Sequence, residues 1–312
     1  MTPRDSQALE VVKLYYRYEL SQNEIATRLG ISRPTVSKLI QHAKDRGFVT
    51  VEIHDPRESG AELADELRTR FGLQEVRLVH DHPIDPELTR ELGRLGASML
   101  QDIVTDGDLV GIAWGRSMHS IALALEPQPR RGVQFIQLKG GISLTPRSTN
   151  DLETMTMFTH AFNAYAWPLP LPVIFDSPEV KHLVEQDRHI RRLLNLGLEA
   201  TVAVFTVGAV SQESVLLKIG QLTENEEKAI LDHAVGDICS RFFDSTGSPF
   251  LSSVDERTIA IPLEKLREKD TRLIVAGGIR KAEALAVALR AGYATHLATD
   301  IDTARLIIDN DC

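Results

Sequence analysis

A lysine stands at the end of an apolar run in the middle of the chain, and two glycines follow it directly. The run is Phe135 to Leu138, and Lys139, Gly140 and Gly141 come next. Glycines let backbone N–H groups approach a ligand closely, and a neutral lysine amine can attack a carbonyl carbon. The alternative is a strand that ends in water. The segment therefore marks a candidate ligand site around Lys139.

Three further apolar runs end in glycine, two of them together with basic side chains. The runs at 108–114, 201–207 and 272–276 are followed by Gly115-Arg116-Ser117-Met118, by Gly208, and by Gly277-Gly278-Ile279-Arg280-Lys281. Ligands of parallel α/β sheets bind at the carboxyl ends of strands, where helix N-termini favour anions. A single Gly-Gly pair is weak evidence, but several strand ends that carry basic side chains predict a binding site for a phosphorylated small molecule. Arg116, Ser117 and Lys281 are the predicted phosphate ligands.

After residue 75, segments typical of strands alternate along the chain with segments typical of helices. Apolar runs typical of strands lie at 76–80, 108–114, 133–138, 171–175, 201–207, 258–262, 272–276 and 296–299. Helical patterns such as 86–104, 178–196 and 281–291 separate most of them. Apolar strands separated by helices predict a parallel sheet covered on both faces, which is a Rossmann-like α/β domain.

The first 54 residues predict a helix-turn-helix with a wing. A helix over 7–18 precedes a capping box formed by Ser21 and Glu24, and Gly30 ends the short helix that starts there. Phe48 to Ile53 alternates as a short strand, the predicted wing. Between them, the second helix has a buried stripe made by Val36, Leu39, Ile40 and Ala43. In this motif the start of the second helix enters the major groove of DNA.

The polar residues outside that stripe are the predicted DNA contacts. Arg33 can make two hydrogen bonds to guanine, and Lys38 can reach bases or phosphates. Gln22, at the start of the preceding helix, is expected to contact a phosphate. The full set is Gln22, Ser32, Arg33, Thr35, Ser37, Lys38, Gln41 and His42. A helical hairpin that binds nothing is the alternative, but two caps, a glycine turn, a stripe and a wing together favour DNA binding.

Charge and composition divide the chain at the same place. Residues 1–54 carry eight Lys and Arg against six Asp and Glu, whereas the whole chain has a net charge of −9. The stretch 55–60 contains no large apolar residue and predicts a linker. Residues 61–312 then form a second domain, which we expect to bind the phosphosugar effector and to mediate oligomerisation.

The same totals exclude several classes of protein. No run approaches the roughly 20 apolar residues of a membrane span, and the first residues lack a signal-peptide pattern. The two cysteines, Cys239 and Cys312, give neither a disulfide framework nor zinc-type spacing. We therefore expect a cytoplasmic protein with no membrane partner, no metal and no cofactor.

These motifs, in this order, resemble the SorC family of bacterial transcriptional regulators over nearly the whole chain. The stretches QLKGGIS, LPLPVIFD, VEQDRHI, FTVG and VGDICSRFFD resemble its deoxyribonucleoside-regulator branch. The resemblance implies a winged helix-turn-helix joined to an effector domain with the fold of sugar-phosphate isomerases. It also implies a tetramer on operator DNA, and repression of catabolic genes relieved by a phosphosugar. For this branch the implied inducer is deoxyribose 5-phosphate.

Carried over position by position, the resemblance assigns roles to several residues. Gly115 to Met118 and Lys281 match phosphate-binding elements, although relatives usually have threonines where Arg116 and Ser117 stand. Lys139 matches a lysine that forms a Schiff base with the sugar aldehyde, and Asn150 matches a polar ligand contact. Arginine keeps its proton in proteins, so a lysine at 139 permits an imine, and a simple point charge is the alternative. The full predicted effector-binding set is Gly115, Arg116, Ser117, Met118, Lys139, Gly140, Gly141, Asn150, Asp237 and Lys281.

An enzyme is the second interpretation of the same residues. A lysine-dependent aldolase or a sugar-phosphate isomerase with an accessory DNA-binding module would also use Lys139. Such an enzyme needs a general acid or base beside the electrophile, and Asp237 is the one candidate near the strand exits. Asp237 could equally be a structural cap. We therefore expect a sensor without catalytic residues.

Overall fold

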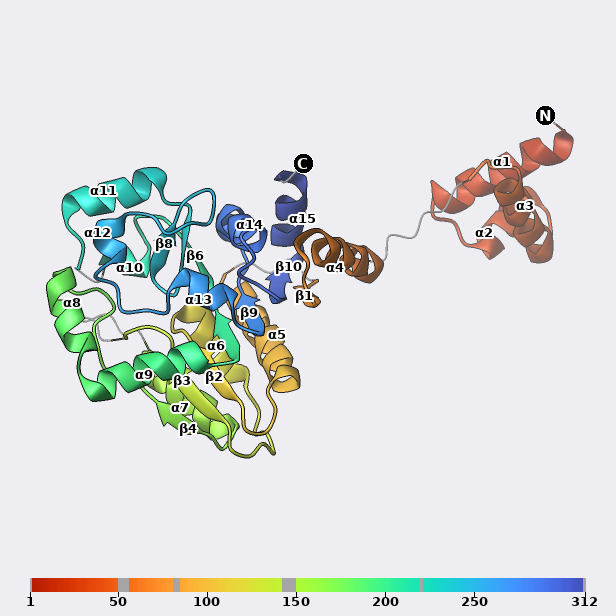
Figure 1. Ribbon diagram of the computed structural model, residues 1–312. Coiled ribbons are helices and arrows are strands. Elements are labelled where there is room, and N and C mark those ends of the chain that lie inside the picture. Colours follow the sequence, from red (N-terminus) through yellow and green to blue (C-terminus); the bar gives the residue numbers. More distant parts are fainter. Residues whose placement is uncertain (1, 50–55, 81–84, 142–149, 219–220, 311–312) are drawn as a thin grey trace. The chain divides into compact units, whose positions relative to one another are not determined.

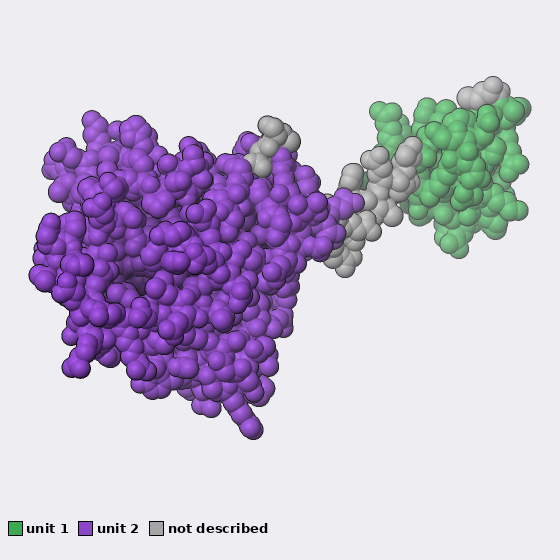
Figure 2. Space-filling view, viewed as in Figure 1, with its two compact units in different colours: residues 1–55 green, residues 56–312 purple. Residues whose placement is uncertain are grey.

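The computed structural model describes residues 2–49, 56–80, 85–141, 150–218 and 221–310 (Figure 1). The chain divides into two compact units, residues 1–55 and 56–312 (Figure 2). Each unit has its own apolar core.

The first unit is a three-helix helix-turn-helix. It consists of α1 (Pro3–Tyr16), α2 (Gln22–Leu29) and α3 (Arg33–Asp45). The predicted capping box starts α2, because the Ser21 hydroxyl accepts from the Glu24 N–H and the Glu24 carboxylate accepts from the Ser21 N–H. Gly30 ends α2 in the left-handed conformation (φ 65°). Ala8, Val11, Val12, Ile25, Val36, Leu39, Ile40 and Ala43 are among the residues that form its core.

The predicted wing falls largely outside the described residues. Phe48 and Val49 are half-buried against the core of the helix-turn-helix and belong to no strand, whereas residues 50–53 are not described. The wing therefore stays a prediction.

The second unit is built on a seven-stranded parallel sheet. In sheet order the strands are β1 (Glu75–Val79), β10 (His296–Asp300), β9 (Thr271–Val275), β5 (Val202–Phe205), β2 (Leu109–Ile112), β3 (Gln134–Gln137) and β4 (Tyr165–Trp167). A smaller antiparallel sheet contains β6 (Val207–Ala209), β7 (Gly236–Ile238) and β8 (Arg241–Phe243). The predicted α/β domain with a parallel sheet is confirmed.

Helices cover both faces of the large sheet. On one face lie α5 (Glu87–Ile103), α6 (Arg116–Ala124) and α7 (Asp151–Ala161), because right-handed crossovers that run the same way along a sheet share a face. The crossovers through α9 (Arg188–Glu199) and α14 (Ala282–Arg290) run the opposite way and take the other face. The remaining helices are α4 (Pro56–Phe71), α8 (Pro178–Glu185), α10 (Val215–Lys218), α11 (Glu224–His233), α12 (Ser252–Asp255), α13 (Leu263–Arg267), α15 (Ile301–Asn310) and the 3₁₀ helix η1 (Ile279–Lys281).

Two predicted strands are not members of either sheet. Segments 171–175 and 258–262 form single bridges instead, between Ile174 and Thr258 and between Lys139 and Ala260. The predicted strand 201–207 is split by Thr206 into β5 and β6, which belong to different sheets. Strands β4, β7 and β8 were not predicted, because three residues are too few to show a period.

The predicted linker is a second point of difference. Helix α4 extends back to Pro56, so residues 56–60 are helical, and the boundary between the units falls after Asp55. Proline is compatible with the first turn of a helix. Gly60 is buried, and a Cβ atom there would overlap the imidazole of His80. Gly60, within the stretch predicted as a linker, therefore allows close packing of α4.

Candidate effector site and DNA-binding helix

The carboxyl edge of the sheet has a switch point between β2 and β5. Strands β2 and β5 are neighbours in the sheet. From β2 the chain passes through α6 to β3, which lies on the far side of β2, whereas from β5 it leads to β9, which lies on the far side of β5. Such a reversal opens a crevice outside the carboxyl ends of the two strands. The exits of β2, β3, β5 and β9 converge near it, and they carry the predicted ligand residues.

Lys139 lies buried just beyond the exit of β3, with 6% of its surface exposed. Its Nζ donates to the Ser240 hydroxyl oxygen at 3.0 Å and lies 3.7 Å from the centroid of the Trp114 ring. Burial lowers the pKa of Lys139, and the nearby charge of Asp237 opposes that shift. Among the described residues Lys139 makes no salt bridge, so its amine faces an aromatic ring and a hydroxyl.

The backbone around Lys139 is fixed from several directions. The Trp114 Nε1 donates to the Gly140 carbonyl at 2.7 Å, and the Gly140 N–H donates to the Ile259 carbonyl at 2.9 Å. A Cβ on Gly140 would lie 2.6 Å from the Leu171 carbonyl oxygen, so only glycine fits. The segments around 171 and 259, predicted as strands, thus hold the loop that presents Lys139.

A second amine, Lys281, donates to a hydroxyl that in turn contacts a hydroxyl at the end of another strand. Its Nζ donates to the Thr206 hydroxyl at 3.3 Å, and that hydroxyl lies 3.5 Å from the hydroxyl of Ser117 in the first turn of α6. Burial lowers the pKa of Lys281 to about 8, while Asp237 opposes the shift and Arg116 adds to it. An ammonium group, two hydroxyls and a helix N-terminus can together hold a phosphate.

Asp237, on β7, interacts electrostatically with both lysines. Burial raises the pKa of its carboxyl group, while Lys139, the Ser240 N–H and Lys281 lower it. Its Oδ2 accepts from the Ser240 N–H at 3.2 Å, and a Cβ on Gly208 would overlap its Oδ1. Asp237 therefore caps a turn and also interacts electrostatically with both amines, and its role toward a ligand stays a prediction.

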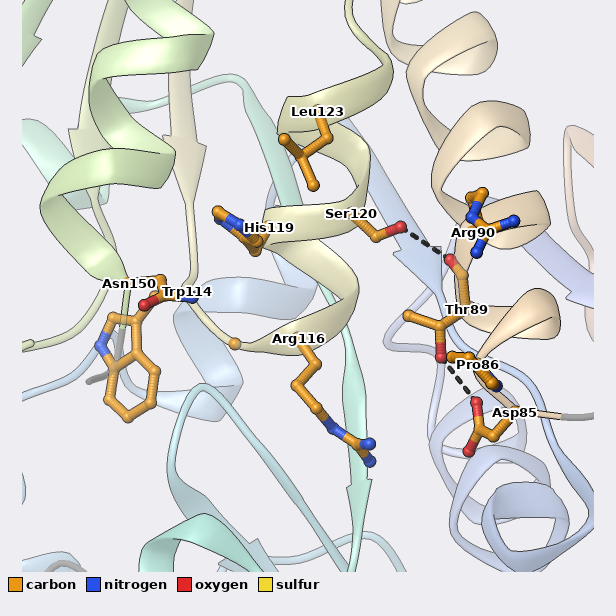
Figure 3. A pocket seen from close by; sticks show the side chains of 11 residues that line it. Asp85, Pro86, Thr89, Arg90, Trp114, Arg116, His119, Ser120, Leu123 and Asn150 are labelled. Carbon is orange, nitrogen blue, oxygen red and sulfur yellow. Dashed lines mark hydrogen bonds between the residues drawn. The ribbon is translucent and has the colours of Figure 1, made fainter. Parts of the chain in front are cut away.

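A groove of about 380 Å³ adjoins this cluster (Figure 3). Trp114 and Asn150 lie on one side of it, Arg116 and His119 lie on α6, and the residues at the start of α5 form the opposite wall (Figure 3). Asn150 has a left-handed backbone (φ 52°) immediately before α7. Lys139, Asp237 and Lys281 do not line the groove, but Trp114, whose ring lies against the Lys139 amine, does, so the groove adjoins the lysine cluster along Trp114 and the start of α6.

Two residues predicted to contact the effector pack into the protein instead, and two residues that contact the lysines were not predicted. Met118 is fully buried in the core, so its side chain is unavailable to a ligand. Gly141 packs against Asp151, whose carboxylate a Cβ at 141 would overlap. Thr206 and Ser240 were not predicted. Thr206 directly follows the β5 run and could have been found as a strand exit, but no sequence signal places the Ser240 hydroxyl on Lys139.

Most of the predicted DNA contacts lie exposed on the first unit. Ser32, Arg33, Ser37, Lys38 and Gln41 are exposed, whereas Gln22, Thr35 and His42 are half-buried. The Ser32 hydroxyl accepts from the Thr35 N–H, so it caps α3. The exposed face at the start of α3 is therefore basic and polar, as the sequence predicted.

His42 differs from that prediction. Its Nε2 lies 2.8 Å from the Oδ1 of Asp5, a buried residue of α1. Hydrogen bonding from the Thr2 N–H, then from His42, lowers the pKa of Asp5. The sequence places His42 outside the stripe of α3, but α1 covers that side. His42 therefore ties α3 to α1, and its Nε2 is taken up by Asp5.

A helix-turn-helix unit joined to an α/β unit with a lysine-rich switch-point site defines a ligand-responsive DNA-binding regulator. Comparisons with known proteins agree. Residues 55–309 match the family model described as "Putative sugar-binding domain", and residues 1–58 match the MarR family model. The chain belongs to the SorC family of sugar-responsive transcriptional regulators.

Named relatives match along the full length. The chain is 42% identical to the deoxyribonucleoside regulator of Bacillus subtilis strain 168, covering 97% of each protein. It is 27% identical to the sorbitol operon regulator of Klebsiella pneumoniae over 96% of each. The crystal structure of full-length SorC from Klebsiella pneumoniae aligns with a TM-score of 0.73 at 25% identity, covering 99% of this chain and 100% of that one.

These relatives are transcriptional regulators, so the chain is a regulator and not an enzyme. Within the described ranges, no helix combines the length and the apolar character that crossing a bilayer requires.

Proposed function

We propose that the protein represses genes of deoxyribonucleoside or sugar catabolism and is induced by deoxyribose 5-phosphate held as an imine on Lys139. One observation carries the proposal: the Lys139 amine is buried against an aromatic ring and a hydroxyl, without an ion pair among the described residues. Burial favours the neutral amine, which is the nucleophile. The Trp114 ring, 3.7 Å from Nζ, favours the ammonium form and so acts against burial.

The two ends of the cluster suit the two ends of such a ligand. Deoxyribose 5-phosphate opens to an aldehyde, which Lys139 can attack. Its phosphate would lie on Ser117, Thr206 and Lys281, where two hydroxyls and an amine already interact. Asp237 interacts with both lysines, which supports one ligand reaching from one amine to the other. The 42% identity to a deoxyribonucleoside regulator supports the same ligand class.

Induction requires that the effector favour one state of the protein over another. A ligand shifts an equilibrium only by the difference in its affinity for the two states. We propose that the imine supplies part of this difference, that the regulator is a tetramer on its operator, and that effector binding releases the DNA. Effector and operator binding with no mutual change in affinity would contradict this mechanism.

The imine is tested by intact mass after borohydride reduction with deoxyribose 5-phosphate. Wild-type protein should gain the mass of one sugar phosphate, less one water and plus two hydrogens. Lys139→Arg should gain nothing, because a guanidinium cannot condense with an aldehyde. Lys265→Arg is the matched control, since Lys265 is exposed and pairs with Glu268 on the surface.

Three outcomes separate the alternatives. Thermal stabilisation by the ligand without an adduct would mean that Lys139 acts only as a point charge. Neither adduct nor stabilisation would refute this effector. Turnover of the sugar phosphate would contradict a regulator without catalytic residues.

A further inference from the structure

The turn between β7 and β8 has an unusual backbone. Ile238 pairs with Arg241, so only Cys239 and Ser240 connect the strands. Both have positive φ, 50° and 67°. Two-residue hairpins of this type favour Asn-Gly, because other side chains are strained in the left-handed region. Among the described residues this is the one place where two consecutive non-glycine residues have positive φ.

The surroundings hold this turn on both sides. Before it, the Asp237 carboxylate accepts from the Ser240 N–H at 3.2 Å. After it, the Arg241 guanidinium donates to the Ile261 carbonyl at 2.9 Å and to the Asp255 carboxylate at 2.6 Å. A strained backbone persists where neighbouring contacts impose it, and such positions cluster at functional sites.

The strain places one polar group against a reactive one. Ser240 is 0% exposed, and its hydroxyl oxygen accepts from the Lys139 Nζ at 3.0 Å. The other residue of the turn does not compete chemically, because burial raises the pKa of the Cys239 thiol to about 12 and keeps it protonated. The turn therefore presents the Ser240 hydroxyl to Lys139.

We infer that Ser240 is the proton relay for imine formation at Lys139, and this inference rests on the proposed function above. In the first step the nitrogen lone pair forms the C–N bond and the carbonyl π pair moves to oxygen. Ser240 accepts a proton from the nitrogen and passes its own hydroxyl proton to that oxygen, which gives a neutral carbinolamine. A hydroxyl that accepts from the amine also orients the amine lone pair toward the ligand.

The second step releases water. The nitrogen lone pair forms the C=N bond, the C–O bond breaks, and the departing hydroxide takes the proton of the Asp237 carboxyl group. The products are water, a protonated imine and the Asp237 carboxylate, which then pairs with the imine charge. Burial raises the pKa of Asp237, and this favours the carboxyl form that the step requires.

The test measures reductive methylation of Lys139 by formaldehyde and cyanoborohydride, followed by peptide mass spectrometry on the full chain. Formaldehyde forms an imine with any accessible amine, so the result does not depend on the identity of the effector. Ser240→Ala and Ser240→Gly should both slow labelling of Lys139 by about a hundredfold. Ser245→Ala, at an exposed serine beyond β8, is the matched control and should label at the wild-type rate.

The two variants separate chemistry from stability. Glycine is favoured at positive φ, so Ser240→Gly should melt at or above the wild-type temperature, whereas Ser240→Ala should melt below it. Both leave more room beside Lys139, so reduced access would not explain slower labelling. Labelling at the wild-type rate in either variant would overturn the inference. Failure of deoxyribose 5-phosphate to form a borohydride adduct with wild-type protein would refute the proposed imine with that effector, while the formaldehyde comparison would still decide the role of Ser240.

Discussion

The ionisation of Lys281 gives a quantitative prediction about effector binding. Burial lowers the pKa of this amine to about 8, against 10.5 for an ordinary lysine. A phosphate binds the ammonium form, which predominates at pH 7. Each pH unit above the pKa reduces the protonated fraction about tenfold, which corresponds to ~1.4 kcal/mol. If Lys281 holds the phosphate, affinity should therefore fall about tenfold between pH 7 and pH 9.

Three charged groups act on this ionisation, and all must be considered. Asp237 and Asp85 raise the pKa of Lys281, and Arg116 lowers it. Asp237 has a raised pKa itself. The Asp237 carboxylate keeps Lys281 protonated to higher pH but also repels the phosphate, so its two effects on phosphate binding oppose each other.

The assay is calorimetric titration with a sugar phosphate whose aldehyde has been reduced to an alcohol. This ligand cannot form an imine, so the ionisation of Lys139 does not enter through covalent chemistry. Lys281→Arg is the comparison, because arginine stays protonated and should flatten the profile between pH 7 and pH 9. Equal affinity of the wild-type protein at pH 7 and pH 9 would refute the assignment of Lys281 to the phosphate.

Three further predictions concern the fold and the site. The pKa of Asp5 is lowered in the folded state, so the ionised Asp5 carboxylate stabilises the first unit above the ordinary pKa of aspartate, and this stabilisation is lost as the pH falls. Asp5→Asn should therefore make unfolding of the first unit, measured by circular dichroism, less sensitive to acid. Gly208→Ala would push a Cβ into the Asp237 carboxylate, so it should cost about 1–3 kcal/mol in urea unfolding and weaken effector binding. Arg257→Met would leave the Glu226 carboxylate and two buried carbonyls without their donor; a loss of about 3–5 kcal/mol is expected, and an unchanged melting temperature would contradict the role of this ion pair.

Arg116 lies beside the proposed phosphate site, at the start of α6. Its side chain is exposed at the first turn of α6, and it lines the groove beside the lysine cluster (Figure 3). Its positive charge also lowers the pKa of Lys281, the neighbouring phosphate candidate. Arg116 therefore adds a positive charge beside the site and also makes Lys281 lose its proton more easily.

The sequence by itself determined the local features of the protein. The capping box at Ser21, the glycine end of α2 and the stripe of α3 depend on contacts three or four residues apart, so the helix-turn-helix could be read directly. The parallel sheet followed from apolar runs between helices, and Lys139 and Lys281 followed from glycine at strand exits. These patterns are local, so they can be recognised without knowing which segments pack against each other.

The tertiary structure alone decided which of these residues meet. His42 lies outside the stripe of α3 but pairs with Asp5 because α1 packs there. Met118 belongs to the predicted phosphate loop, but its side chain is buried in the apolar core. Ser240 reaches Lys139 from a turn 101 residues away in the chain. Such contacts depend on how helices and sheets pack, and no pattern within one segment encodes the segment that will lie against it.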